Sequence, residues 1–259
     1  MTKETRLLRD QGFELLRVPD ENDPNDQRLV LRDLTDERMH PLAVDFLEPR
    51  HLHRLKHGVS KRQPMARALG FGSAKRAEAP YVIDATAGLG VDAFFIAALG
   101  CRVRAIERSP TVAALLEDGL RRLRAAVDRG ECEPHEALKG IVDRLTLTVG
   151  DARDILASLS EAERPDVIYM DPMYPEEGRS ETALPKKAMR MFRRLIGEDA
   201  DAELVFEIAR EKARDRVVVK RPLKAPPIAG VRPTHSFEGK TARYDMYQSL
   251  SGLGVGRIR

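Results

Sequence analysis

Apolar runs alternate with amphipathic segments from Pro80 onward, and this alternation constrains the fold more than any other feature of the sequence. Short continuous apolar runs are typical of strands that are buried on both faces of a parallel sheet, and amphipathic segments between them are typical of covering helices. We expect strands at residues 81–86, 101–107, 145–150, 166–170 and 216–220. We expect helices at about residues 91–99, 111–127, 152–159, 185–196 and 202–213. The sequence therefore predicts an α/β fold with a mostly parallel sheet.

The end of the chain breaks this alternation. Residues 232–238 and 243–249 are both strand-like, and only residues 239–242 separate them. Two strands joined by so short a connection are antiparallel. We therefore expect the main domain, residues 77–259, to end in an antiparallel hairpin.

Residues 1–76 are expected to form a small N-terminal extension. Within it, residues 28–32 and 42–47 alternate as short strands do and flank a polar segment, which predicts a β-hairpin. Residues 50–76 are expected to form a loop and a short helix that lead into the main domain.

Positive charge is gathered in two segments, although the net charge of the chain is only +3. Residues 50–76 contain eight Lys or Arg and no Asp or Glu, and residues 179–194 contain six basic residues and one acidic residue. Gathered positive charge attracts polyanions by counterion release, which indicates a nucleic acid partner; two solvated helix faces are the alternative. The two cysteines form no CxxC pair, no metal site is expected, and the charged N-terminus is typical of a cytoplasmic protein without a membrane span.

A glycine-containing turn follows the first predicted strand. Gly88 and Gly90 allow the backbone to turn tightly and approach a ligand at the start of a helix. Glu107 ends the second strand, where its carboxylate can accept hydrogen bonds from both ribose hydroxyls of an adenosine. The pattern Gly88 to Ala93 also fits a dinucleotide, so by itself it leaves the cofactor open.

Two further carboxylates favour S-adenosylmethionine (SAM) over a dinucleotide. Asp151 ends the third strand, where it can accept the amino group of adenine, and Asp84 ends the first, where it can meet the cationic amine of a methionine moiety. The C-terminal hairpin, in place of a second βαβαβ half, points the same way. For Asp92 and Asp151, stabilising a helix N-terminus is the alternative role.

The fourth strand delivers the segment Asp171-Pro172-Met173-Tyr174-Pro175 to the same edge of the sheet. The lone pair of an aromatic amine is delocalised into its ring and must be recovered before it can attack a methyl group. Asp171 and the backbone carbonyl of Pro172 can accept hydrogen bonds from the two N–H groups of the amine, and Tyr174 can stack on the base. Because a paired base could not reach the cofactor, the substrate base must be unpaired or flipped.

These segments resemble the ribosomal RNA small subunit methyltransferase J family over about residues 44–248. The resemblance rests on Asp84 to Gly90, Gly100 to Val103 with Glu107-Arg108, Asp171 to Pro175, Lys186-Lys187 and Val217 to Pro222. It implies a Rossmann-like SAM-dependent methyltransferase fold and transfer of a methyl group to the exocyclic N2 of a guanosine in small-subunit (16S) ribosomal RNA. The implied cofactor contacts are Val91, Asp92, Glu107, Arg108, Asp151, Ala152 and Asp171.

The chain departs from the family at Val91, where the family often has Arg, and at Tyr174, where it often has Phe. Basic residues from both charged segments and from the end of the fifth strand are the expected RNA contacts: Arg54, Lys56, Lys61, Arg62, Lys186, Lys187, Arg190, Lys220 and Arg221. For Lys220 and Arg221 a phosphate or the base carbonyl is the expected partner, or else a solvated strand end. An adenine-N6 methyltransferase acting on RNA or DNA and a non-catalytic RNA-binding domain are the competing functions.

Overall fold

The computed structural model describes residues 8–20, 23, 26–36, 38–72, 78–173, 191, 194–195 and 201–251. Tyr174, Lys186, Lys187 and Arg190 lie outside the described residues, as does most of the helix expected at 185–196. Statements about these positions therefore remain predictions.

Seven strands form the main sheet, in the order β5-β4-β3-β6-β7-β9-β8. The strands are β3 (Tyr81–Asp84), β4 (Arg102–Glu107), β5 (Leu145–Val149), β6 (Val167–Met170), β7 (Arg216–Pro222), β8 (His235–Glu238) and β9 (Ala242–Gln248). Strands β3 to β7 are all parallel to one another, whereas β9 is antiparallel to both of its neighbours, β7 and β8. The five predicted parallel strands and the terminal antiparallel hairpin are confirmed.

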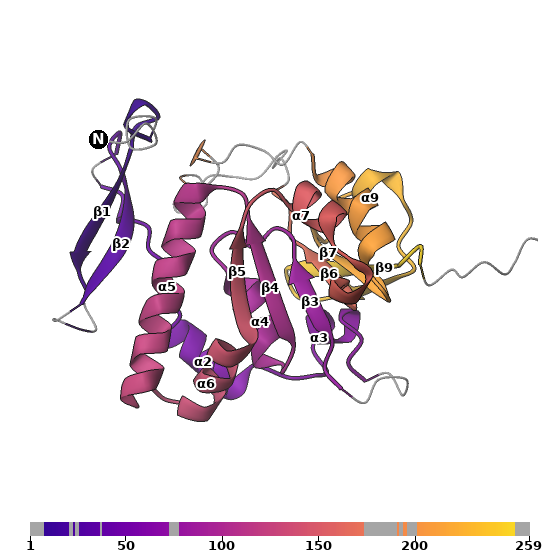
Figure 1. Cartoon of the computed structure of the whole chain (residues 1–259), viewed down its shortest axis with the longest axis horizontal. Coiled ribbons are helices and arrows are strands. Elements are labelled where there is room, and N and C mark those ends of the chain that lie inside the picture. Colours follow the sequence, from indigo (N-terminus) through magenta and orange to yellow (C-terminus); the bar gives the residue numbers. More distant parts are fainter. Residues whose placement is uncertain are drawn as a thin grey trace, which may run out of the picture.

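Helices cover both faces of the sheet (Figure 1). On one face α4 (Val91–Ala98), α5 (Pro110–Arg129) and α6 (His135–Arg144) pack in a core that includes Val82 and Val167. On the other face α7 (Ala152–Ser158) and α9 (Ala202–Lys212) pack with Ile83 and Ile168. Successive residues of the central strands β3 and β6 enter opposite cores, which is why these two strands are mostly apolar. Helix α6 was not predicted, because its buried apolar side chains are only Leu138 and Ile141.

The N-terminal hairpin differs from the prediction. Strand β2 (Gln27–Asp33) contains the expected residues 28–32, but its partner is β1 (Phe13–Pro19) rather than 42–47. Leu42 makes only an isolated bridge to Leu31. The following segment buries its side chains against helices instead of extending the sheet: the ring of Phe46 stacks on Phe94 with centroids 4.9 Å apart.

Helix α5 anchors this hairpin through a buried carboxylate. Asp118 accepts hydrogen bonds from Arg17 at 3.0 Å, from the backbone N–H of Leu29 at 2.9 Å and from Arg122 at 3.1 Å. Arg122 is itself buried and also donates to Asp20 at 3.2 Å. These contacts join the hairpin to α5, and Figure 1 shows the two side by side.

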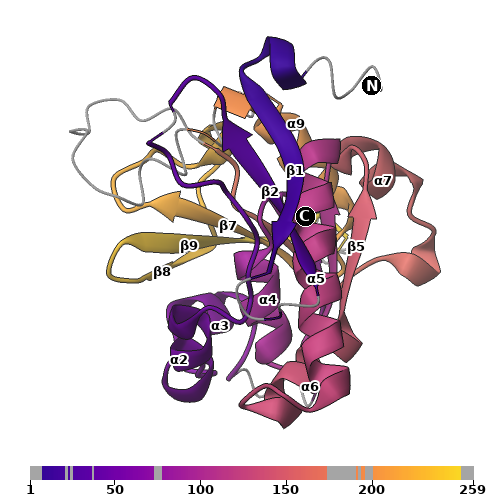
Figure 2. The ribbon, with the colours of Figure 1, turned by 90° about the vertical axis from the view of Figure 1, so that its left-hand side faces the viewer.

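The basic segment forms two helices, α2 (Pro49–His57) and α3 (Pro64–Ala68), where a loop and one helix were expected. Helix α3 packs against β8 and β9, and Figure 2 shows α2 and α3 together below that hairpin. His51 of this basic segment is buried beside Phe94 and Phe95 and does not lie at the surface.

Candidate active site

The turn between β3 and α4 requires glycine at two positions. Gly88 has φ +54° and Gly90 has φ +77°, in the left-handed region that other residues avoid. A Cβ atom on Gly90 would lie 2.4 Å from a methyl carbon of Leu116. The backbone therefore turns closely at the carboxyl edge of β3, where an open α/β sheet binds its ligands.

Glu107 stands at the same edge, at the end of β4. Its side chain is almost fully buried, and its two oxygens accept hydrogen bonds from the backbone N–H groups of Gly88 at 2.9 Å and Ser109 at 2.7 Å. Each carboxylate oxygen can accept a second hydrogen bond. The glycine turn thus fixes the orientation of Glu107, and its contact with the ribose hydroxyls stays a prediction.

The register of the sheet brings Asp171 and Lys220 together. Met170 of β6 pairs with Val219 of β7, so the next residue of each strand emerges at the edge beside the other. The ammonium of Lys220 donates to Asp171 Oδ2 at 2.7 Å and to Asp92 Oδ2 at 2.8 Å. The hydroxyl of Tyr169 also donates to Asp92, at 2.7 Å.

The backbone after β6 is held by a side chain from the first loop. The N–H of Asp171 donates to Thr86 Oγ1 at 2.6 Å, and Pro172 is buried. The carboxylate of Asp171 nevertheless remains 40% exposed. A fixed backbone with an accessible carboxylate is the arrangement that orientation of a substrate amine requires.

This edge carries more negative than positive charge. Burial, followed by the nearby Asp92 and Asp171, raises the pKa of Asp84 well above its ordinary value. Burial opposes the charge of Lys220, but Asp171 and Asp92 outweigh it and raise the pKa of this ammonium. Asp92 and Asp171 outnumber the single ammonium of Lys220 even without a charge on Asp84, which favours a ligand that brings positive charge, as SAM does through its amine and its sulfonium.

Two of the predicted cofactor contacts, Asp151 and Arg108, form ion pairs with other residues of the protein. Asp151 caps α7 by accepting from the backbone N–H of Arg153 at 2.8 Å and also pairs with the Arg153 guanidinium. Arg108 donates to both oxygens of Asp201, at 2.8 and 3.0 Å. Asp151 therefore caps the N-terminus of α7, which is the alternative role that the sequence left open. The cofactor contacts expected of Asp151 and Arg108, and of the other residues predicted to bind SAM, stay predictions.

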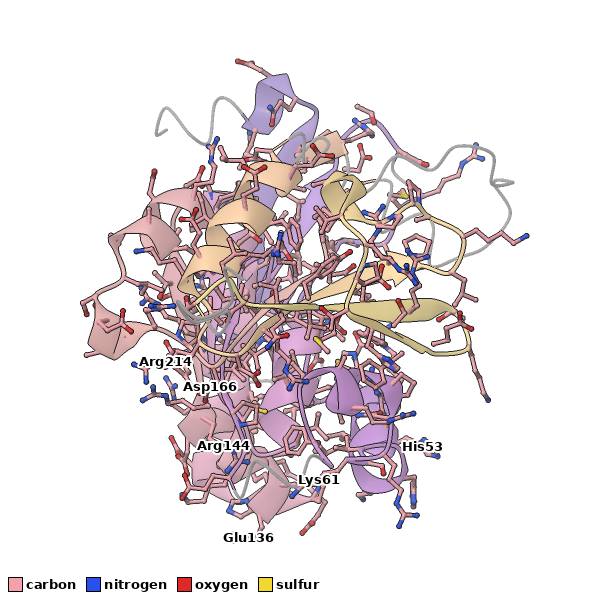
Figure 3. All side chains as sticks on the ribbon, turned by 90° about the vertical axis from the view of Figure 1, so that its right-hand side faces the viewer. His53, Lys61, Glu136, Arg144, Asp166 and Arg214 are labelled. Carbon is pink, nitrogen blue, oxygen red and sulfur yellow. The ribbon has the colours of Figure 1, made fainter. Side chains whose placement is uncertain are left out.

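The expected RNA contacts divide into exposed and covered residues. Lys56, Lys61 and Arg62 are exposed, and Figure 3 labels Lys61 in the lower part of the molecule. Lys220 is directed at Asp171 and Asp92, not at open solvent. Arg221 is 3% exposed and donates to the carbonyl of Pro226, so it is not a solvated strand end, and its RNA contact stays a prediction.

Sequence reasoning missed two contributors to this edge. Thr86, which holds the backbone of Asp171, was not singled out. Asp84 pairs with Tyr169 in the parallel register, and Thr86 and Asp171 each lie two residues beyond these paired positions. This equal spacing could have indicated that Thr86 and Asp171 lie side by side. The contact of Lys220 with Asp171 was missed because it depends on strand order.

Comparison with known proteins agrees with this geometry. The SAM_MT family model of SAM-dependent methyltransferases matches residues 16–249. A crystal structure of a SAM-dependent methyltransferase from Neisseria gonorrhoeae superimposes with a TM-score of 0.67 at 30% identity, covering 99% of this chain and 96% of that one. The fold and the site thus define a SAM-dependent methyltransferase.

Curated relatives narrow this class. The ribosomal RNA small subunit methyltransferase J of Thioalkalivibrio sulfidiphilus is 47% identical over 207 residues, which are 80% of this chain and 76% of that protein. The protein of the same name from Pseudomonas fluorescens (strain Pf0-1) is 45% identical over 222 residues, 86% of this chain and 80% of the relative. The chain belongs to the ribosomal RNA small subunit methyltransferase J family. Among the residues that the structure describes, no helix is both long and apolar enough to span a bilayer.

Proposed function

We propose that this chain transfers the methyl group of SAM to the exocyclic N2 of a guanosine in small-subunit (16S) ribosomal RNA. The observation that carries the proposal is the position of Asp171. Its carboxylate is accessible, its backbone is held by Thr86, and it lies at the edge of the sheet where Gly88 and Gly90 turn the chain.

The residues at this edge have distinct roles in the proposed reaction. SAM, when bound, supplies a methyl group that its positive sulfur has already activated. One N–H of the amino group donates a hydrogen bond to Asp171 and the other donates to the backbone carbonyl of Pro172, which directs the nitrogen lone pair. Tyr174 stacks on the displaced base. Most of the acceleration then comes from positioning and from charge that is already in place.

The pairing of Asp171 with Lys220 supports guanine as the base. Guanine presents hydrogen-bond donors at N1 and N2 and an acceptor at O6, whereas adenine has no carbonyl group. A carboxylate beside an ammonium, 2.7 Å apart, complements such a donor and acceptor edge. Asp171 would face the N2 amine while Lys220 donates to the O6 carbonyl.

The exposed Lys56, Lys61 and Arg62 are proposed to contact RNA phosphates, together with Lys186, Lys187 and Arg190. Small-subunit ribosomal RNA, free or assembled in the subunit, is then the partner, and the cytoplasm is the proposed location. Replacing Lys61 and Arg62 by methionine should lower the salt dependence of RNA binding by about one unit of slope for each lost phosphate contact.

Isotope transfer into ribosomal RNA tests the proposal. Ribosomal RNA and small subunits from cells that lack this protein are incubated with it and with methyl-labelled SAM, digested to nucleosides and analysed by mass spectrometry. The label is expected in N2-methylguanosine at one 16S position in at least one of the two substrates, and reactions without SAM serve as the control. Label in N6-methyladenosine, or in no nucleoside, would contradict the proposal.

A further inference from the structure

A small open pocket lies beside the active site, between the basic helices and the β8–β9 hairpin. Its volume is about 110 Å³, which is room for more than a single water. Helices α2 and α3, the hairpin turn and β9 supply its walls. The lining residues that matter for binding are Arg54, Gln63, Met65, Lys240 and Tyr244.

The lining combines two cations with an apolar wall. Arg54 and Lys240 bring positive charge and no lining residue is acidic, while Met65 and the ring of Tyr244 provide apolar surface. The guanidinium carbon of Arg54 lies 3.7 Å from the centroid of the Phe95 ring, which holds this cation in the wall. Aromatic surface next to fixed positive charge is the combination that binds single-stranded nucleotides.

Tyr244 connects the pocket to the reacting groups. It lies directly opposite Lys220 in the antiparallel pairing of β7 and β9, so the two side chains are neighbours on one face of the sheet. Lys220 in turn contacts Asp171 at 2.7 Å. A ligand in the pocket is therefore separated from the amine-binding carboxylate by these two side chains.

The pocket also contains a hydrogen-bond donor that is not satisfied. Within the described part of the chain, the side-chain amide nitrogen of Gln63 is buried and has no acceptor. A buried donor without an acceptor is unfavourable. An acceptor on a bound ligand, such as a base carbonyl or a ribose oxygen, would relieve this cost after a rotation of the amide.

We propose that this pocket binds a nucleotide adjacent to the target guanosine, with its base against Tyr244 and its phosphate between Arg54 and Lys240. This inference rests on the proposed RNA substrate and adds a second recognition site to it. A target that must leave its stack loses contact with its neighbours, and a second pocket holds one of them in register with the reacting base.

Binding of modified oligonucleotides tests the contact with Tyr244. The probes are oligonucleotides spanning the methylated guanosine, either intact or with the base removed on its 5′ or its 3′ side, and anisotropy is read without turnover. Tyr244→Ala should weaken binding of the intact probe about tenfold, within the range for one stacked base, and Tyr244→Phe should bind as the unaltered protein does. Removing one of the two neighbouring bases should cause the same loss, and combining it with Tyr244→Ala should add nothing further. The proposal is overturned if the loss of affinity from Tyr244→Ala multiplies with the loss from base removal on both sides of the guanosine. It is also overturned if Tyr244→Phe binds the intact probe as weakly as Tyr244→Ala does.

Salt dependence on whole small-subunit ribosomal RNA tests the phosphate contact without requiring methylation. Arg54→Met and Lys240→Met should each lower the slope by about one unit, whereas Lys139→Met, an exposed lysine on α6 outside the pocket, should not. Unchanged slopes for both pocket variants overturn the phosphate contact. If these shifts appear while nucleoside analysis finds no N2-methylguanosine, the proposed reaction fails and the RNA-binding pocket stands. Melting temperatures recorded beside each variant identify any that fail to fold.

Discussion

Replacing Lys220 by methionine removes the cation that lies between Asp171 and Asp92. Two opposite unit charges about 2.7 Å apart attract by roughly 6 kcal/mol at an effective dielectric constant of about 20, before desolvation is subtracted. The carboxylate of Asp171 is 40% exposed, so water screens much of this attraction. Exposed pairs contribute about 0–1 kcal/mol, and breaking a buried pair costs about 3–5 kcal/mol. Because this site is intermediate between exposed and buried, we expect Lys220→Met to remove about 2 kcal/mol of the electrostatic stabilisation of the charged form of Asp171.

A loss of this size should appear in the pH dependence of methyl transfer. Without the ammonium, the charged form of Asp171 is less favoured, so the acidic limb of single-turnover rate against pH should move to higher pH by about one unit or more, since one unit corresponds to about 1.4 kcal/mol. Part of the rate should return above that limb. Lys139→Met is the matched control and should keep the original profile. An acidic limb that stays in place in Lys220→Met would refute an electrostatic role of Lys220 on Asp171.

Four further perturbations follow from the same contacts. Because burial and neighbouring carboxylates raise the pKa of Asp84, SAM binding should release a proton from Asp84 and should tighten as pH rises. Asp84→Asn should abolish this proton release, which calorimetry in two buffers measures. The same variant should weaken SAM binding by about 10- to 100-fold, as expected for loss of a hydrogen bond to a charged group. Gly90→Ala should destabilise the fold in two ways: the left-handed backbone conformation costs about 1–2 kcal/mol, and the close approach to Leu116 costs about 1–3 kcal/mol more. An unchanged urea midpoint would show that the turn does not require glycine at this position. Asp118→Ala leaves Arg122 short of a partner and should lower the free energy of unfolding by about 3 kcal/mol in urea titrations. Burial lowers the pKa of His51 from its usual 6.5, so its contribution to stability is complete above that pH and is lost as pH falls below it; His51→Asn should flatten the decline, and an equally steep curve would exclude His51 as its source.

The central sheet could be predicted from the sequence because its signal is local. The central strands are buried on both faces and are therefore mostly continuous apolar runs, as in Val167 to Met170. The aspartate or glutamate that follows such a run marks the carboxyl edge of the sheet. Asp84, Glu107 and Asp171 were found in this way.

Features that depend on contacts distant in sequence were not predicted. The partner of β2 is β1, and this choice follows from anchoring on α5 by Asp118, which no local pattern announces. Arg221 looked like a free cation at a strand end, yet the chain after β7 returns so that the Pro226 carbonyl meets its guanidinium. The strand order that places Lys220 beside Asp171 is likewise a property of the whole sheet.

The role of Asp171 is tested most directly by separating methyl transfer from cofactor binding in Asp171→Ala. Single-turnover transfer into 16S ribosomal RNA and SAM affinity by calorimetry are measured on the same preparation. A site in which this carboxylate orients the amine predicts loss of at least about 100-fold in transfer rate, within the range for a residue acting in the transition state. SAM affinity should stay within about tenfold, because Glu107, Asp84 and the glycine turn remain. Undiminished transfer with unchanged affinity would contradict the assignment.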